Sequence, residues 1–259
     1  MKPGSFIING VYSEDVDAII QTRPALASPR RKVEFKNTYG QSGMLPYDEE
    51  EYENTELELA LYINGKSAAS SREIIYHLFD SGHYIDLIMY SDPTKIYKVM
   101  MLEPPSFESR YYMGEGTTCS IKLSVLPYKL LVDSPVISLT TPTEIYNPTL
   151  WDAQPTIAIY GSGDIILKIN SVPFNMKGVS GDIVVNSTIS NAYTAKKKQT
   201  PGGSFYDLKE MELLPEMVVP MNNKIYTRLY PLISPGVNSV NWIGNVSRVD
   251  ILPKWRTLI

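Results

Sequence analysis

The chain has 259 residues, enough for one large domain or two of ordinary size, and we interpret it as two. Hydrophobic residues make up 43% and charged residues 20%, a balance that is typical of a folded protein with a sizeable core and excludes a disordered chain. The sequence contains no run of about 18 apolar residues, which excludes a membrane-spanning helix. A net charge of −4 argues against a general nucleic-acid-binding protein.

The start of the chain and its cysteine content indicate where the protein is made. The first 17 residues lack the apolar segment and cleavage pattern of a signal peptide, so we expect synthesis in a cytoplasm. A single cysteine, Cys119, excludes an internal disulfide and a CxxC metal site. It lies in a strand-like run, which predicts a small buried hydrophobic residue.

The first elements of the chain are predicted as strands with one exposed loop. Phe6-Ile7-Ile8 before Asn9-Gly10 predicts a strand and a turn. Residues 23–31 contain two prolines and three arginines and predict an exposed loop. The segment from Lys32 to Tyr39 alternates, with Val33 and Phe35 on one face, and predicts a strand before a turn at residues 40–43.

An acidic run occupies residues 48–58, where seven of eleven residues are Asp or Glu. It concentrates the charge of the first half: residues 1–133 contain 13 basic and 19 acidic residues, a net −6, whereas residues 134–259 contain 11 and 9, a net +2. Because like charges repel and stay in water, one interpretation is a solvated hairpin or loop. The alternative is an arm that contacts basic residues of a partner.

The acidic run leads into a half-buried strand and then a helix. Leucines 57, 59 and 61 alternate with polar residues and predict that strand. Ser70 with Glu73 three residues later predicts a capping box at the start of the helix, and Gly82 predicts its end. His77 and His83 are the only histidines, and neither has neighbours typical of a metal site.

Further strands and a change of composition complete the first half. We predict strands at the following ranges: 84–90, 95–102, 107–113 and 117–126. Prolines then recur among Ser and Thr between Pro127 and Pro148, and we place the domain boundary near Asp133. The predicted domains are therefore residues 1–133 and 134–259.

The second half is predicted to be an antiparallel sandwich of short strands. Residues 154–170 predict a hairpin with its turn at Gly161-Ser162-Gly163-Asp164. This glycine-rich turn leads back into a strand, which excludes a phosphate-binding loop. Residues 195–203 predict an exposed basic loop. Further strands are predicted at 181–187, 204–208, 217–219, 224–232, 237–243 and 246–251.

No set of residues predicts an active site. The sequence contains no GxSxG, HExxH or EF-hand pattern and no Cys–His pair with supporting residues, so we predict neither an enzyme nor a bound cofactor or metal. Trp151, Trp242 and Trp255 could stack on sugar rings, but their positions favour packing in a core. An adhesin would expose at least one of them beside polar groups in a groove.

The sequence resembles the distal tail proteins of long-tailed phages with non-contractile tails along its whole length. In the first half the resemblance rests on residues 6–10, 33–43, the predicted helix and 122–128. In the second half it rests on residues 159–165, 234–244 and 253–256.

This resemblance implies an N-terminal β-rich domain with one helix and a projecting hairpin, and a C-terminal galectin-like or carbohydrate-module-like β-sandwich. It further implies a homo-oligomeric ring of six subunits in the virion, at the tail tip. The implied partners are the tail tube protein, a tail-associated protein and the receptor-binding or baseplate proteins, with DNA passing through the ring. The implied function is that of a structural hub rather than an enzyme. The alternative is a carbohydrate-binding adhesin that acts through the sandwich.

Head-to-tail contacts that close produce rings, and a subunit of such a ring needs an exposed complementary surface. By position, the acidic hairpin around residues 47–54 is the candidate arm. We predict that the oligomer interface includes Tyr47, Asp48, Glu49, Glu50, Glu51 and Tyr52, and that these residues face Arg23, Arg30 and Arg31.

Overall fold

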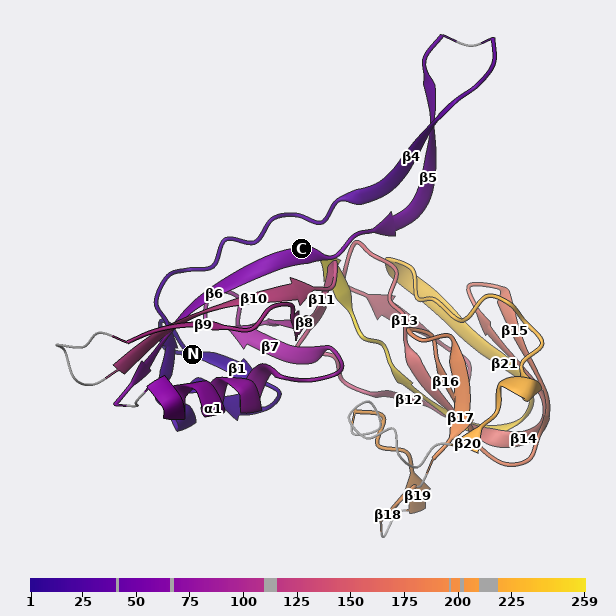
Figure 1. Ribbon diagram of the computed structural model, residues 1–259. Helices are drawn as coiled ribbons and strands as arrows, with labels where there is room; N and C mark the ends of the chain where they lie inside the picture. Colours follow the sequence, from indigo (N-terminus) through magenta and orange to yellow (C-terminus); the bar gives the residue numbers. More distant parts are fainter. Residues whose placement is uncertain (41, 66–67, 110–115, 196, 201–202, 210–218) are drawn as a thin grey trace. The chain divides into compact units, whose positions relative to one another are not determined.

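The computed structural model describes residues 1–40, 42–65, 68–109, 116–195, 197–200, 203–209 and 219–259 (Figure 1). Contacts divide the chain into a first unit, Met1–Val132 with Leu258–Ile259, and a second unit, Asp133–Thr257. Strands dominate both units, which confirms the prediction of a mainly β protein. Among the residues described, no helix is long and apolar enough to cross a membrane.

The first unit is built on one large antiparallel sheet. Its main path runs β2-β1-β7-β8-β10-β6-β3, with β9 beside β10, β11 beside β8, and β22 beside β11. The strands are β1 (Phe6–Ile8), β2 (Val11–Tyr12), β3 (Ala18–Ile20), β6 (Thr55–Asn64), β7 (Ile85–Met89), β8 (Lys95–Met101), β9 (Ser106–Ser109), β10 (Gly116–Val125), β11 (Tyr128–Leu131) and β22 (Arg256–Leu258). A short 3-10 helix, η1 (Ser13–Val16), precedes β3. Residues 110–113 of the strand predicted at 107–113 lie outside the described residues.

The core of the first unit lies between this sheet and the helix α1 (Ala68–Phe79). Side chains of β6 alternate between buried and exposed, as the leucine pattern predicts, and β6 pairs with β10 over ten residue pairs from Gly116↔Asn64 to Val125↔Thr55. The helix packs on β9 and β10 and buries Phe79 against Phe6, with ring centroids 6.3 Å apart. Cys119 is buried in this core, and burial raises the pKa of its thiol to about 12.

The predicted start of the helix is wrong. The helix begins at Ala68, so Ser70 lies inside it and cannot be the N-cap of a capping box with Glu73. Alanine is the strongest helix former, and Ala68-Ala69 extends the helix toward its N-terminus beyond the serine that the pattern selected. Residues 66–67, where a cap would stand, lie outside the described residues.

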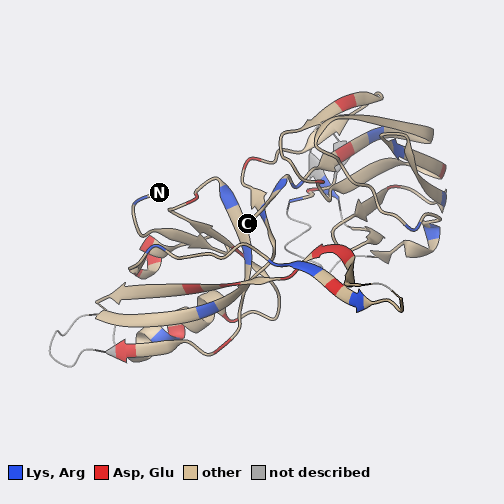
Figure 2. Cartoon of the chain, turned by 90° about the horizontal axis from the view of Figure 1, so that it is seen from above, with Lys and Arg blue, Asp and Glu red and all other residues tan. Residues whose placement is uncertain are grey.

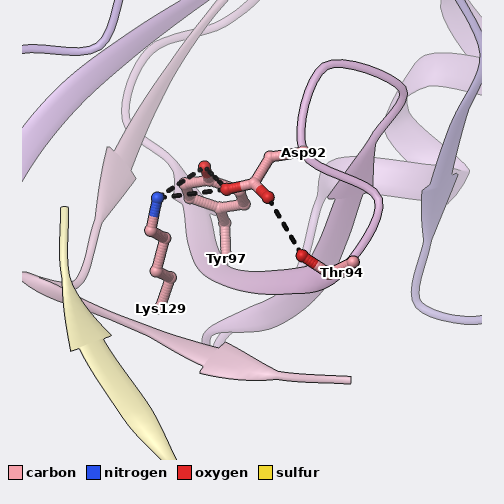
Figure 3. A network of polar contacts seen from close by, with 4 residues as sticks. All are labelled: Asp92, Thr94, Tyr97 and Lys129. Carbon is pink, nitrogen blue, oxygen red and sulfur yellow. Dashed lines mark hydrogen bonds and ion pairs between the residues drawn. The ribbon is translucent and has the colours of Figure 1, made fainter. Parts of the chain in front are cut away.

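A polar network joins the turn between β7 and β8 to β11 (Figure 3). Asp92 accepts hydrogen bonds from Thr94 at 3.3 Å and from the Tyr97 hydroxyl at 3.0 Å, and its carboxylate pairs with Lys129 at 3.0 Å. Burial alone would raise the pKa of Asp92, but the hydrogen bonds from Lys129 and Tyr97 outweigh it and lower that pKa. The network therefore uses an ionised carboxylate to hold β11 to the sheet.

The chain returns to the first unit at its last described residues. The backbone N–H of Ile259 donates to the carbonyl oxygen of Pro127 at 3.1 Å, and Ile259 packs against the core of this unit. The first unit is therefore completed by residues from both ends of the sequence.

The second unit contains an eight-stranded antiparallel sheet, with the path β12-β21-β14-β16-β17-β20, β13 beside β21, and β15 beside β14. A two-stranded sheet, β18 (Lys198–Thr200) with β19 (Gly203–Phe205), follows β17, and a 3-10 helix, η4 (Asn222–Lys224), follows β20. The strands of the main sheet are β12 (Ile137–Leu139), β13 (Thr143–Asn147), β14 (Thr156–Ile169), β15 (Val172–Val179), β16 (Ile183–Asn186), β17 (Asn191–Thr194), β20 (Val219–Pro220) and β21 (Gly236–Leu252).

Several predicted elements of the second unit differ from the structure. The strand predicted at 224–232 is instead the end of η4 and a segment that makes one isolated bridge, Met176↔Ile225. The two strands predicted between 237 and 251 are one strand, β21. Residues 217–218, and residues 196 and 201–202 of the predicted basic loop, lie outside the described residues.

The predicted position of the turn in the hairpin at residues 154–170 is wrong. Strand β14 continues through Gly161-Ser162-Gly163-Asp164, and the chain reverses at Asn170 and Ser171, both with positive φ. The pairing of β14 with β21 shifts register at Tyr160/Gly161 and at Ser162/Ile166. A Cβ on Gly244 of β21, where φ is +116°, would lie 2.5 Å from the carbonyl oxygen of Asp164. The glycines therefore permit a bulge and a close approach of two long strands.

The sheet of the second unit is buried on both faces where β14 and β16 pair. Ile157 and Ile159 are buried on one face, and Ala158 and Tyr160 belong to a separate cluster on the other face. The Tyr160 hydroxyl accepts a hydrogen bond from the backbone N–H of Tyr206 at 2.8 Å. The segment around Tyr206 therefore covers the second face.

Candidate functional site

The candidate site is the hairpin formed by β4 (Arg31–Asn37) and β5 (Met44–Tyr52). These strands form a two-stranded sheet of their own and pair with each other alone among the strands described (Figure 1). β4 confirms the predicted strand from Lys32 to Asn37, whereas residues 38–39 already lie beyond the strand. The predicted turn at residues 40–43 is confirmed where described, and Gly40 and Gly43 both have positive φ. We call this element the β4–β5 hairpin.

The register of the hairpin separates its side chains into two faces. Val33 lies opposite Asp48, Phe35 opposite Pro46, and Asn37 opposite Met44, which places these residues on one face. Glu34 lies opposite Tyr47 on the other face. On that face the ammonium group of Lys36 lies 4.6 Å from the centre of the Tyr47 ring and 3.2 Å from the Glu34 carboxylate.

The first of these faces has an apolar middle between Asp48 and Asn37 at its two ends, and most of its side chains are exposed. Phe35 is 64% exposed and Met44 58% exposed, although both are large apolar side chains. Together with Val33 and Pro46 they form a continuous surface that we call the apolar face. An isolated two-stranded hairpin is marginally stable in water, and a contiguous exposed apolar surface is typical of an interaction site.

The base of the hairpin is held to the first unit by aromatic and polar contacts. The ring of Tyr52 packs edge-on against Tyr128, with centroids 6.1 Å apart. The side-chain amide of Asn54 donates to the Tyr84 hydroxyl at 2.6 Å and to Ser124 at 3.1 Å. These contacts position the base of the hairpin on the first unit.

The acidic run begins in a bulge of β5. Between the pairs Arg31↔Tyr52 and Val33↔Asp48, three residues of β5 lie opposite Lys32 alone. Glu50 has a positive φ of 59°, and its N–H donates to the carboxylate of Asp48 at 2.9 Å. We call Asp48–Glu51 the acidic bulge, and Figure 2 shows its acidic residues gathered at the bend of the strand.

Two of these carboxylates are paired within the same hairpin. The guanidinium of Arg31 donates to Asp48 at 2.7 Å and lies over the Tyr52 ring, and Lys32 pairs with Glu51 at 2.7 Å. The hydrogen bond from Arg31 lowers the pKa of Asp48, and that from Lys32 lowers the pKa of Glu51. The hairpin therefore retains an excess of negative charge, because Glu49, Glu50 and Glu53 make no ion pair among the described residues.

The three arginines predicted to face the acidic residues lie in different places in the structure. Arg31 is in β4 and pairs with the acidic bulge of its own chain, so it is not free to pair with a neighbour's. The Arg30 carbonyl accepts the N–H of Glu53 at 2.8 Å, which places Arg30 at the base of the same hairpin. Arg23 lies exposed in the preceding loop. The sequence analysis did not identify Lys32 as a partner of the acidic residues. It also did not identify Met44 and Pro46 as interface residues, although they alternate with Leu45 and Tyr47 in the sequence.

The tryptophans of the second unit do not form an exposed aromatic platform. Trp255 is buried, with 5% of its surface exposed, and Trp151 and Trp242 are half-buried. A cavity of about 500 Å³ is lined by residues of the first unit only, among them Lys2, Glu14 and Tyr62. No tryptophan lines this cavity.

The fold is that of a phage tail protein of known structure. The crystal structure of the SPP1 Dit protein (gp 19.1), described as a paradigm of the hub adsorption apparatus in phages that infect Gram-positive bacteria, matches with a TM-score of 0.60. The match covers 98% of this chain and 99% of that chain at 14% sequence identity. The resemblance to the distal tail proteins is confirmed in this structural comparison.

The other two comparisons give no match. No protein-family model matches the sequence, and no curated protein matches it. The similarity that the comparisons show is therefore one of fold.

Proposed function

We propose that this protein is a structural subunit of a phage tail tip, where it assembles into a hexameric ring that serves as the distal hub. In this role the ring joins the tail tube to the tail-tip or baseplate and receptor-binding components, and the protein is part of the virion rather than an enzyme. The match to SPP1 Dit over nearly the full length of both chains is the observation that carries this proposal.

The β4–β5 hairpin supports the proposal with a surface that suits assembly. Its apolar face is exposed to water in the isolated chain, and burying it on a neighbouring copy would remove that unfavourable exposure. The interface residues predicted from sequence, Tyr47 to Tyr52, are on the same hairpin. Arg23 and Arg30 stay candidates for the rim of such an interface.

The experiment is the mass of the purified protein by light scattering over about a hundredfold range of protein concentration. A hexamer would have six times the monomer mass of 29.1 kDa. We expect Phe35→Ser with Met44→Ser to shift the protein to monomers. Because the apolar contact does not depend on charge, this loss should be the same at low and high salt.

The matched control is Leu45→Ser, which removes an exposed apolar side chain from the opposite face of the same hairpin. It should leave the oligomer intact. A wild-type protein that stays monomeric at every concentration would overturn the proposed self-assembly. An oligomer that survives the apolar-face variant would show that a different surface forms the ring.

A further inference from the structure

A group of basic residues surrounds an exposed tyrosine at the edge of the second unit. The segment after η4 runs beside β15: Met176 forms a bridge with Ile225, and the N–H of Tyr226 donates to the carbonyl oxygen of Asn175 at 2.9 Å. The hydroxyl of Thr227 accepts the N–H of Asn175 at 2.8 Å. This pairing fixes which side chains of the two segments lie together.

The bridge brings two lysines into the same neighbourhood. Lys177 follows Met176 in β15, and Lys224, the last residue of η4, precedes Ile225. The ammonium group of Lys177 lies 4.9 Å from the centre of the Tyr226 ring. The ammonium group of Lys224 lies beside Gly178, 3.6 Å from where a Cβ on that glycine would stand. Both lysines therefore lie along the C-terminal half of β15, Lys177 toward Tyr226 and Lys224 toward Gly178.

Arg228 adds a third cation, two residues beyond Tyr226 and exposed like it. None of the three cations makes an ion pair with a described residue, and the nearby carboxylate of Asp164 accepts a hydrogen bond from the N–H of Gly178. We call Lys177, Lys224, Tyr226 and Arg228 the basic patch. Cations gathered on one surface repel each other, so a bound carboxylate would relieve their repulsion.

A surface with the opposite charge is present on the same chain. Apart from the pair Lys36–Glu34, the hairpin carries five carboxylates, Asp48 to Glu51 and Glu53, against the two cations Arg31 and Lys32. The excess lies on Glu49, Glu50 and Glu53, which are exposed. The acidic bulge and the basic patch are therefore complementary in charge, each with about three unit charges that lack an ion-pair partner in the described chain.

We propose that the basic patch of one copy binds the acidic bulge of a second copy. This contact between copies depends on the proposed ring. It is sensitive to salt, whereas the contact made by the apolar face is not. The basic patch takes the place of Arg31 as the predicted partner of the acidic residues, because Arg31 is already paired within its own hairpin.

A charge swap in the full chain tests the contact. We expect Glu50→Lys or Lys177→Glu alone to weaken self-association about three- to tenfold at about 0.1 M salt, with a smaller effect at about 1 M, where the Debye length falls from about 10 to about 3 Å. A chain with both substitutions should regain association, because the two charges are then exchanged. Lys95→Glu, the same charge change on the first unit, should have no effect.

The outcomes separate this proposal from the proposed function. If the wild-type protein assembles and the double variant Phe35→Ser with Met44→Ser does not, the proposed ring is supported. If the single charge variants then associate like wild type, or if the swap does not restore association, the contact between bulge and patch is overturned. Association by wild type that weakens with salt while Lys177→Glu has no effect would assign the acidic bulge to a different cationic surface, and this result would also overturn the contact. Far-UV circular dichroism of each variant verifies its folding.

Discussion

β5 and β6 follow each other in the chain, and they use their apolar residues in opposite ways. β6 buries alternate side chains, among them Leu57, Leu59 and Leu61, in the core of the first unit. β5 is exposed along its length except at Tyr52, so Met44, Leu45 and Tyr47 face solvent. Alternation of apolar residues therefore predicts a strand in both cases, but it does not tell whether the apolar face meets its own chain or a partner.

The largest expected difference between the two strands is in stability. Leu61→Ala in β6 should lower the free energy of unfolding of the first unit by about 2–5 kcal/mol, because it leaves a cavity in a packed core. Leu45→Ala in β5 should change it by less than about 0.5 kcal/mol, because the side chain is already half exposed. Urea unfolding followed by circular dichroism measures both. Equal losses would mean that the hairpin is packed as firmly as the core.

A glycine substitution should sharpen the contrast between tightly packed and open positions, here between two strands that approach closely and the loop after α1. Gly244→Ala should destabilise the second unit by about 1–3 kcal/mol, because it combines a positive φ with a clash against the Asp164 carbonyl. Gly82→Ala, where nothing lies within 4 Å, should be close to neutral. Thermal unfolding of the two variants tests this, and a neutral Gly244→Ala would show that the bulge relaxes freely.

A smaller effect is expected from the network that holds β11. Because the pKa of Asp92 is lowered in the folded state, its contribution is present above its ordinary value of 3.8 and is lost as the pH falls through the folded-state pKa. Asp92→Asn should cost about 1 kcal/mol at neutral pH and should reduce the loss of stability between neutral pH and about pH 3. Measuring the free energy of unfolding at several pH values tests this prediction. If the variant lost as much stability on acidification as the wild type, the prediction would be contradicted.

The smallest effect is expected in the hairpin itself. Asp48→Asn removes an ion pair with Arg31 that is exposed to water, and such pairs contribute little to stability. The midpoint of unfolding should not change measurably at any salt concentration. A clear loss of stability would show that the acidic bulge supports the fold of the first unit, contrary to the contrast with β6.

The sequence was most informative where local chemistry decides the structure. The alternation in β6, the turn after Asn9-Gly10 and the hairpin on either side of residues 40–43 follow from side-chain pattern and turn residues, and the structure has them. The first part of the acidic run, residues 48–52, lies on the exposed strand β5, whereas residues 55–58 belong to β6. Arg31 was among the predicted partners of the acids, but Lys32 was not, because the register of the hairpin brings it opposite them and the sequence alone does not fix that register.

Tertiary contacts account for most of what the sequence did not predict. Gly161 to Asp164 has the composition of a turn, yet pairing with β21 and β15 continues the strand through it. Lys177 and Lys224 are 47 positions apart in the sequence, and the bridge between their neighbours Met176 and Ile225 brings them onto one surface. The start of α1 was missed because a good capping pattern at Ser70 competes with helix-forming alanines before it.

The return of Ile259 to Pro127 makes the second unit an insertion into the first. The chain leaves the first unit after Val132 and rejoins it at Leu258, so residues 133–257 are attached through two covalent links. A module inserted in this way can be lengthened or exchanged between related proteins without opening the fold that receives it. Surfaces of the second unit can then diversify while the host unit, with its hairpin, is preserved.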